Sequence, residues 1–298
     1  MKKYAVALGS FDGLHLGHMA VINKALSFKS LGYVPCALVF DVHPMSVAGA
    51  GAPAELMTVQ ARDEMLTSLG LEIKKVSFES IMGLSAREFV SEILCKELNA
   101  GAVCCGYNYH FGCGAKADSS ELSMLCGEFD IACEVAEKIE YDGVAVSSTR
   151  IREALQNGDI ESANAMLGRE FSYDFVVVSG DRRGRLIGAP TINQNFPDGF
   201  IVPKFGVYVS AVFVDGQLHP AVTNIGRRPS FTCDDLRSET CIMDFSGDLY
   251  GKNIEVKLIK YIRPERVFNS LEELGNQIAV DAKKAKDVFL KYNFLSCI

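Results

Sequence analysis

The sequence lacks several features that would place it in a class at once. It has no apolar run near the roughly 18 residues that are needed to cross a bilayer. None of its ten cysteines form a C-x-x-C pair, the spacing typical of zinc sites. It has no internal repeat and no low-complexity segment. These absences argue against a membrane-spanning protein, a zinc finger and a repeat protein.

The cysteines and the N-terminus together indicate a cytoplasmic protein. Ten cysteines without a spacing pattern are expected to be reduced, mostly buried thiols of a reducing compartment, with a metal or redox site as the alternative. Met1-Lys2-Lys3 before residues 4–8 only faintly resembles a secretory signal. The apolar part is too short and has no cleavage site after it, so a first β-strand explains it better.

Charge is unevenly distributed along the 298 residues. The net charge is −7, and residues 1–170 carry 14 Lys+Arg against 22 Asp+Glu, whereas residues 171–298 carry 16 against 15. An acidic first half argues against broad nucleic-acid binding, so any anionic ligand must be held by a local site. The length itself suits two domains.

The pattern of apolar residues changes near residue 170. Before it, short apolar runs alternate with helical periodicity, which predicts a Rossmann-like, doubly wound parallel sheet with helices on both faces. After it, short β-branched runs separated by turns predict an antiparallel barrel or sandwich, closed by a helix near the C-terminus. We expect domains at 1–168 and 169–298. The expected strands are 4–8, 34–40, 73–78, 102–105 and 131–135, then 175–178, 207–214, 221–225, 240–245 and 254–262.

The clearest local signal is His15-x-Gly17-His18, which follows the first strand and opens the first helix. Free N–H groups at a helix start favour phosphate, and glycine lets the backbone approach it closely. Two imidazoles can neutralise charge that develops on a triphosphate. The alternative is two surface histidines near a turn.

A second signal lies at residues 147–152, Ser-Ser-Thr-Arg-Ile-Arg. Hydroxyl residues before a helix make a good N-cap, which would be a purely structural role. Opposite the histidine motif, the same helix start could bind phosphate or adenine, with Arg152 reaching the polyphosphate. Together the two signals indicate nucleotidyl transfer by positioning and charge stabilisation.

The second half offers weaker signals. Thr191 and Asn193 alternate with Ile192, so both point the same way on an extended backbone. Their neutral oxygens suit Mg²⁺ bound to nucleotide phosphates, although an Asx-type turn is an alternative. Glu239 could deprotonate a hydroxyl that attacks a phosphate, but by itself it is better explained as a surface acid.

Four segments of the first half and three of the second resemble one family throughout the chain. Residues 9–18, 40–44, 105–112 and 147–152 resemble the adenylyltransferase domain of bacterial bifunctional riboflavin kinase/FAD synthetases, and residues 190–193, 224–229 and 239–251 resemble their kinase domain. The resemblance implies catalytic roles for His15, His18, Arg152 and Glu239, and Mg²⁺ binding by Thr191 and Asn193. It implies nucleotide or flavin contacts for Gly9, Ser10, Phe11, Gly17, Asn108, Ser148 and Thr149, and in the kinase for Gly188, Pro190 and Asn224.

The resemblance also implies the reactions. Riboflavin would be phosphorylated to FMN, and FMN would be adenylylated to FAD with release of pyrophosphate, with ATP as co-substrate and Mg²⁺ as cofactor. The expected partners are these small molecules alone, without nucleic acid or membrane, and the oligomeric state stays open. The alternatives are a nucleotidyltransferase with another acceptor, or an inactive flavin- or nucleotide-binding regulator. Asp41 and His43, at the end of the second strand, are equally explained by a turn and by function.

Overall fold

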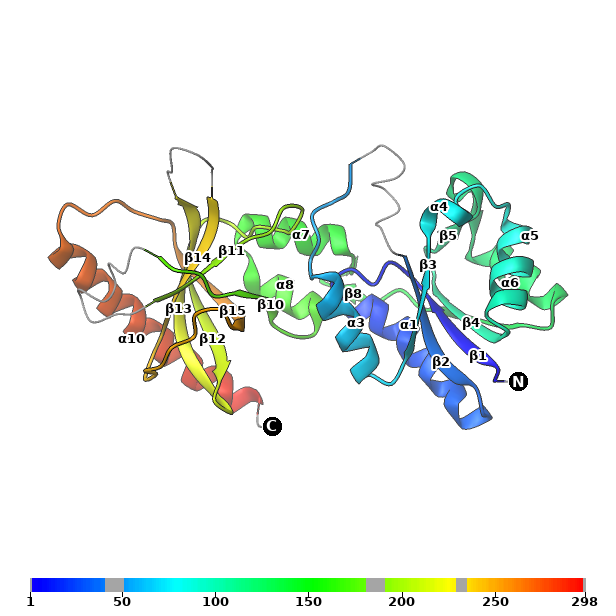
Figure 1. The fold of residues 1–298 in the computed structure, drawn as a ribbon, viewed down its shortest axis with the longest axis horizontal. Helices are drawn as coiled ribbons and strands as arrows, with labels where there is room; N and C mark the ends of the chain where they lie inside the picture. Colours follow the sequence, from blue (N-terminus) through cyan, green and yellow to red (C-terminus); the bar gives the residue numbers. More distant parts are fainter. Residues whose placement is uncertain (1, 41–50, 181–190, 229–234, 297–298) are drawn as a thin grey trace. The chain divides into compact units, whose positions relative to one another are not determined.

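The chain folds as two compact units. The computed structural model describes residues 2–40, 51–180, 191–228 and 235–296, and its contacts divide the chain into Met1–Ser148 and Thr149–Ile298. The first unit contains a parallel sheet and the second an antiparallel barrel (Figure 1). The predicted fold class is therefore confirmed.

The sheet of the first unit has five parallel strands in the order β3-β2-β1-β4-β7. Because side chains alternate along a strand, Val6 and Leu8 face one core while Ala7 faces the other. Strands buried on both faces are expected to be continuously apolar, as β1 is. The strands are β1 (Tyr4–Leu8), β2 (Val34–Phe40), β3 (Glu72–Val76), β4 (Ala100–Gly106) and β7 (Ala132–Ala136).

Helices cover both faces of this sheet. Helices α1 (Leu16–Ser27) and α3 (Val59–Ser68) contribute to the core on the Ala7 face. The π-helix η2 (Phe89–Glu97) and α6 (Ser119–Glu128) contribute to the core on the Val6 face. The sheet is thus doubly wound. Smaller elements are η1 (Phe28–Leu31), α4 (Phe78–Ile81), α5 (Ala86–Glu88), β5 (His110–Phe111), η3 (Cys113–Ala115), β6 (Ala117–Asp118), β8 (Glu140–Tyr141) and β9 (Val144–Ala145).

Two helix starts in the first unit follow directly from local sequence. Ser85 and Glu88 form a reciprocal capping box, and Asp118 accepts hydrogen bonds from two N–H groups at the start of α6. The helix that begins after Ser85 changes character along its length. Its first turn is α-helical, and from Phe89 it continues as a π-helix, with Leu98 N–H donating to the carbonyl of Ile93.

The second unit is a six-stranded antiparallel sheet in the order β10-β15-β12-β13-β14-β11. Its two outer strands meet, because Val178 N–H donates to the carbonyl of Asn193 (2.8 Å). The buried Gln194 amide donates to the carbonyls of Phe175 (2.6 Å) and Ile254 (2.7 Å), which ties β11 to β10 and β15. The sheet is therefore a closed barrel. Its strands are β10 (Phe171–Val176), β11 (Thr191–Asn195), β12 (Gly206–Val214), β13 (Gln217–Arg228), β14 (Asp235–Ile242) and β15 (Asn253–Arg263).

Hydroxyl groups form a row inside the barrel. Thr223 Oγ1 lies 2.8 Å from both Ser210 Oγ and Thr240 Oγ1, so three neighbouring strands are linked by side-chain hydrogen bonds. These three side chains are fully buried. A buried hydroxyl is costly unless it is paired, and the row pairs them with one another.

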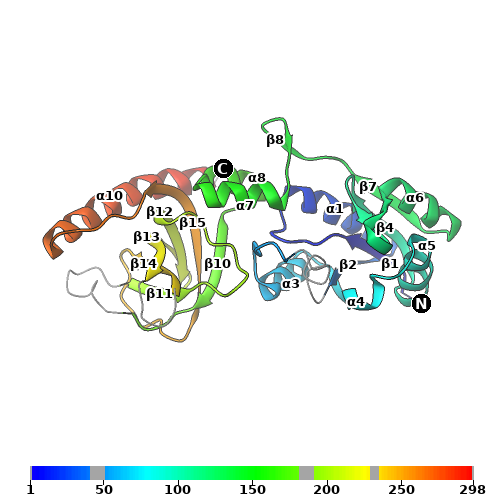
Figure 2. The same ribbon diagram turned by 90° about the horizontal axis from the view of Figure 1, so that it is seen from above.

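Helices surround the barrel. Helix α10 (Leu271–Ser296) packs along its outside through Ala285 and Phe289 (Figure 2). Helix α8 (Ile160–Leu167) also packs against it, because the Asn164 side chain donates to the Leu258 carbonyl and accepts from Phe171 N–H. Helix α7 (Ser148–Asn157) contacts the segment before β12, where Lys204 N–H donates to the Leu155 carbonyl (2.9 Å). The contact division lies at the start of α7, while the boundary expected from sequence, after residue 168, lies at the end of α8 and stays a prediction.

Candidate active sites

The loop between β1 and α1 has an unusual backbone. Three of its residues lie in the left-handed region, Phe11 (φ +53°), Gly13 (φ +79°) and Leu14 (φ +41°). This region is uncommon for a bulky residue, so the surrounding structure must hold it in place. At Gly13 an added Cβ would lie 2.7 Å from the Leu56 side chain, and there the lack of a side chain is required.

The two histidines of the motif stack on each other at the start of α1. Their ring centroids are 3.7 Å apart with 15° between the planes, and Phe11 meets His18 edge-on. His15 is the N-cap, and its Nδ1 accepts the N–H of His18 (3.3 Å). Because Nδ1 accepts, the proton of neutral His15 is on Nε2, where it can be donated to a ligand. The first turn of α1 has no acidic residue to compete with an anion.

Two glycines make room for these rings. A Cβ at Gly17 would lie 3.1 Å from Cε1 of His15, and a Cβ at Gly9 would lie 3.3 Å from the ring of Phe11. Both distances are shorter than ordinary van der Waals contact, so a side chain at either place would displace its ring. Gly9 and Gly17 thus determine how the aromatic side chains of the site lie.

Asp12 joins the loop to two distant segments. Its carboxylate accepts the N–H of Leu56 (2.8 Å), and its carbonyl accepts the Ser148 hydroxyl (2.9 Å). The predicted site residue Ser148 is thereby brought to the loop, through a structural contact. Nothing in the sequence singles out Asp12, although it lies within the motif at residues 9–18.

Asn108 follows β4, which lies beside β1 in the sheet. Parallel strands end at the same edge, and the pairing of Ala7 with Cys104 places residues 105–108 next to the β1–α1 loop. The chain turns back here, with Tyr109 N–H donating to Gly106, and Ser119 of α6 donates to the carbonyl of Tyr107. Strand order reverses between β1 and β4, and ligands of open α/β sheets bind at such switch points.

The other predicted residues of this site are Ser10, Thr149, Arg152, Asp41 and His43. Ser10 is exposed in the loop. Thr149 and Arg152 lie on the first turns of α7, in the second compact unit, so the structure does not place them relative to the histidines. Asp41 and His43 lie outside the described residues.

The barrel brings three predicted polar residues into one row. Asn193 on β11 is paired directly with Glu239 on β14, and Glu239 is paired with Asn224 on β13. Directly paired residues of an antiparallel sheet point to the same face. Thr240 and Thr223, one residue further along, point into the barrel, so Glu239 and Asn224 point outward. Glu239 is exposed and available to a ligand.

Thr191 and Asn193 lie two residues apart on β11, so their side chains share this outer face. The Asn193 side chain is only 4% exposed, and a Cβ at Gly180 would lie 2.4 Å from its amide nitrogen. One hydroxyl and one amide oxygen fit Mg²⁺ that also binds nucleotide phosphates. Among the described residues, no group of three or more His, Cys, Asp or Glu is arranged to hold a metal ion.

A pocket opens beside Thr191. It is lined by the side chains of β11 and of the segment that follows β14, including Thr191, Ile192, Phe245, Asp248, Leu249 and Tyr250. Apolar walls with a few polar groups are typical of small-molecule sites. The predicted residues Gly188 and Pro190 lie outside the part of the chain that the structure describes.

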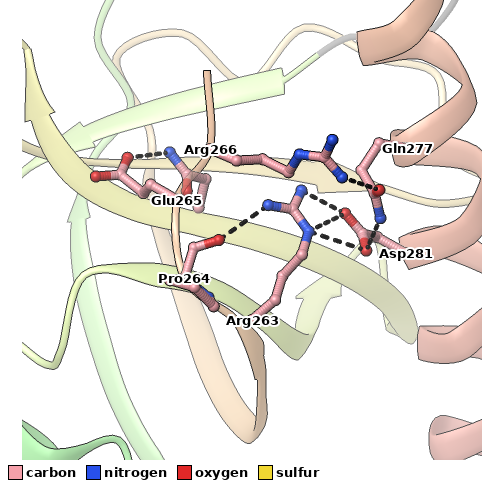
Figure 3. Close-up of polar contacts among 7 residues, drawn as sticks. Arg263, Pro264, Glu265, Arg266, Gln277 and Asp281 are labelled. Atoms are coloured by element: carbon pink, nitrogen blue, oxygen red, sulfur yellow. Dashed lines mark hydrogen bonds and ion pairs between the residues drawn. The ribbon is translucent and has the colours of Figure 1, made fainter. Parts of the chain in front are cut away.

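Glu265, just after β15, is a further polar residue beside this row. Its carboxylate accepts from the Asn224 amide (3.1 Å), and a Cβ at Gly226 would lie 2.1 Å from it. Figure 3 shows how the segment that carries Glu265 is held: Arg263 binds the Asp281 carboxylate of α10 through two nitrogens (3.1 and 2.7 Å). No local sequence signal marks Glu265, because its contact comes from a strand 41 residues away.

A doubly wound sheet with a histidine loop at its switch point, followed by a closed barrel with a polar row and an adjoining pocket, defines a two-domain nucleotide-processing protein. Known proteins make this specific. The FAD synthetase family matches residues 1–150 and the riboflavin kinase family matches residues 167–289. The chain belongs to the family of bifunctional riboflavin kinase/FMN adenylyltransferases.

Individual relatives cover nearly the whole chain. The bifunctional riboflavin kinase/FMN adenylyltransferase of Bacillus subtilis is 34% identical over 293 residues, covering 95% of this chain and 92% of that protein. The protein of the same name from Escherichia coli (strain K12) is 32% identical, covering 95% and 92%. A crystal structure described as a macrolide-efflux protein from Streptococcus pneumoniae superposes with a TM-score of 0.87 at 28% identity, covering 96% of this chain and 94% of that one. Within the described residues, none of the helices is long and apolar enough to cross a membrane.

Proposed function

We propose that the two reactions of this family take place at the two sites described above. Riboflavin is phosphorylated to FMN on the barrel, and FMN is adenylylated to FAD at the β1–α1 loop. The observation that carries this division is that the first unit holds the histidine loop and the second holds the polar row of Asn193, Asn224 and Glu239. The two units also match two different families, one for each reaction.

On the barrel, Glu239 acts as the general base. Its exposed carboxylate takes the proton of the riboflavin 5′-hydroxyl as that oxygen attacks the γ-phosphorus of ATP. Asn224 is paired with Glu239 and donates a hydrogen bond to Glu265. These two contacts hold Asn224 beside the base. The pocket lined by Phe245 and Tyr250 accepts an aromatic ring system.

Magnesium is proposed to bind at Thr191 and Asn193. When bound, it offsets the charge of the nucleotide phosphates during transfer. The side-chain oxygens of Thr191 and Asn193 share one face of β11 and would hold the ion together with the nucleotide phosphates. Gly180 leaves the space that the Asn193 amide occupies.

At the β1–α1 loop, a phosphate oxygen of FMN attacks the α-phosphorus of ATP and pyrophosphate leaves. His15 donates a hydrogen bond from Nε2 to the polyphosphate. The His18 ring stacks on the His15 ring, so both imidazoles can stabilise the charge that develops there. The N–H groups at the start of α1 add to this stabilisation. Arg152 and Asn108 are proposed to contact the nucleotide from α7 and from the β4 edge.

The partners that follow are riboflavin, FMN, FAD and ATP, and we place the protein in the cytoplasm. All eight cysteines within the described residues are free thiols, which fits a reducing compartment.

Product analysis tests the proposal. Purified protein is incubated with Mg-ATP and either riboflavin or FMN, and flavins are separated by chromatography. Riboflavin should yield FMN and then FAD, and FMN should yield FAD with one pyrophosphate per FAD. If either substrate is bound but stays unconverted, the corresponding site assignment is wrong.

A further inference from the structure

The carboxylate of Glu265 lies in a space that a glycine leaves open on the outside of the barrel. A Cβ at Gly226 would lie 2.1 Å from one carboxylate oxygen, 2.6 Å from the carboxylate carbon and 2.8 Å from the other oxygen. The φ angle of Gly226 is outside the left-handed region, so its backbone conformation does not require glycine. The lack of a side chain at Gly226 therefore makes room for Glu265.

The same carboxylate binds the side chain of Asn224. Nδ2 of Asn224 donates to Oε1 of Glu265 (3.1 Å). Asn224 and Gly226 lie two residues apart on β13, so both face the outside of the barrel, where Asn224 is paired with Glu239. Glu265 thus lies over Gly226 and reaches along β13 to the neighbour of the proposed base.

The segment that carries Glu265 is held by α10 on both sides (Figure 3). Before it, Arg263 binds the Asp281 carboxylate through Nε (3.1 Å) and Nη2 (2.7 Å), and the Asp281 side chain is buried. After it, Arg266 donates to Gln277 (3.2 Å). The backbone of the exposed Glu265 is therefore fixed against the barrel, which keeps its carboxylate within reach of β13.

This contact fixes the orientation of the Asn224 amide. A carboxylate accepts hydrogen bonds and does not donate them, and only the nitrogen end of an amide donates. Glu265 therefore holds the nitrogen of Asn224 toward itself, and the amide oxygen is the end presented to other donors. The two ends of an amide have nearly the same shape, so without such a partner either end can face a ligand.

The oxygen of Asn224 is suitably placed for a hydroxyl of the substrate. Directly paired side chains have Cβ atoms about 4.5–5.5 Å apart, and Asn224 is directly paired with Glu239. Riboflavin carries further hydroxyls on its ribityl chain beside the one that reacts. While the base takes the proton of the 5′-hydroxyl, the amide oxygen can accept a hydrogen bond from another hydroxyl of the same chain.

We propose that Glu265 is a positioning residue for riboflavin, an inference that rests on the kinase site proposed above. Glu265 holds the Asn224 amide so that its oxygen accepts a hydrogen bond from a ribityl hydroxyl. Gly226 is part of this arrangement, because it leaves the space for the carboxylate. Glu265 touches neither ATP nor the reacting atoms. Its loss should therefore weaken riboflavin binding and leave the chemical step nearly intact.

Steady-state kinetics with riboflavin at saturating Mg-ATP test this role. ADP release measures the kinase step alone, because adenylylation releases pyrophosphate. Glu265→Ala should raise KM for riboflavin about tenfold, as expected for one lost hydrogen bond, and should change kcat less than about threefold.

Two conservative variants separate reach from charge. Glu265→Gln keeps an acceptor oxygen at the same reach and should keep KM for riboflavin within about threefold of the unsubstituted value. Glu265→Asp keeps the charge but is one methylene shorter, so it should behave like Glu265→Ala. The opposite order of these two variants would mean that Glu265 acts through its charge, and the proposal would be wrong.

Gly226→Ala tests the geometry while the carboxylate is kept. The added methyl group should displace the flexible end of Glu265 and raise KM for riboflavin about tenfold. In the double variant with Glu265→Ala the two effects should not add, because the group that is displaced is already absent. Gly275→Ala in α10 has open space around it and is the matched control, with kcat and KM unchanged. Additive effects would overturn the proposal.

Two further readouts make the outcome unambiguous. Thermal unfolding identifies any variant that fails to fold, and if Gly226→Ala does so, the Gln and Asp variants of Glu265 decide. FMN adenylylation belongs to the other unit and should be unchanged in every variant. If the unsubstituted protein releases no ADP with riboflavin, the kinase assignment is wrong. If it does and Glu265→Ala keeps the same KM, only the positioning role is wrong.

Discussion

The two proposed active sites are built in opposite ways. At the β1–α1 loop the histidines, the glycines and Phe11 all lie within residues 9–18, and their geometry comes from a left-handed backbone and one helix start. On the barrel the polar row joins Asn193, Asn224 and Glu239, which meet only because three strands pair in register. The first site is thus a local structure and the second a tertiary one. A local site should be damaged by small changes within its loop, and a tertiary site also by changes far away.

The largest expected effect is the separation of the two activities at Glu239. Glu239→Ala removes the proposed general base and should lower kcat for riboflavin phosphorylation by about 10³-fold, within the usual range for such a group. Adenylylation of FMN should be unchanged. Steady-state rates with each flavin measure both. Glu255→Ala, another barrel glutamate in a different row, is the control and should leave both rates intact. Loss of both activities in folded Glu239→Ala would show that the two reactions do not take place at separate sites.

The reciprocal change is His18→Ala. It removes one of two stacked imidazoles, so FMN adenylylation should fall by roughly 10²-fold while riboflavin phosphorylation is kept. His219→Ala, on β13 of the barrel unit, is the control and should leave FMN adenylylation unchanged. Pyrophosphate release with FMN as substrate measures the loss. A full rate in His18→Ala would remove that histidine from the proposed site.

The dependence of the barrel on distant contacts can be tested at Asp281. Its side chain is buried and paired with Arg263, so Asp281→Ala leaves a guanidinium without its carboxylate and should destabilise the barrel unit by about 3 kcal/mol. Kinase activity should then disappear at a lower denaturant concentration than adenylyltransferase activity. Lys286→Ala, which breaks the exposed pair with Asp244, should cost under about 1 kcal/mol. Equal loss of both activities in Asp281→Ala would mean that the units do not unfold separately.

The smallest expected effect probes the local site. Gly17→Ala should displace the His15 ring and lower FMN adenylylation about tenfold, because a small misplacement of a positioning group is costly. Helix stability should not fall, since alanine favours a helix more than glycine does. Gly127→Ala in α6 has open space around it and is the matched control. If the two variants have the same adenylylation rate, the ring position does not matter for transfer.

The same contrast explains how far the sequence could predict the molecule. The parallel sheet, its helices and the histidine loop could be predicted because strand runs, caps such as Ser85 and the motif at residues 15–18 are local signals. For the second unit the sequence predicted either a barrel or a sandwich, because no local signal shows that Val178 pairs with Asn193 and closes the sheet. The role of Glu265 could not be predicted, because it depends on contact with a distant strand. The contact of Ser148 with Asp12, 136 residues away, was hidden for the same reason.

Resemblance filled part of this gap. It selected Glu239, Asn224 and Asn193 from many polar strand residues, and pairing then placed them in one row. It said nothing about Asp12, whose carboxylate and carbonyl hold the loop from inside. The role of Asp12 depends on the backbone conformation of the loop, where Phe11, Gly13 and Leu14 have positive φ angles. The sequence motif shows only the glycine among these three.

The bridge between Val178 and Asn193, which closes the barrel, affects the dynamics of the barrel. The backbone carbonyl of Asn193 accepts the bond from Val178 that joins the outer strands, and the same residue's side chain faces the proposed magnesium position. Asn193 therefore couples magnesium binding at its side chain to opening of the bridge at its backbone. Hydrogen exchange of the Val178 amide should slow when Mg-nucleotide binds, which makes this single proton a reporter of kinase-site occupancy.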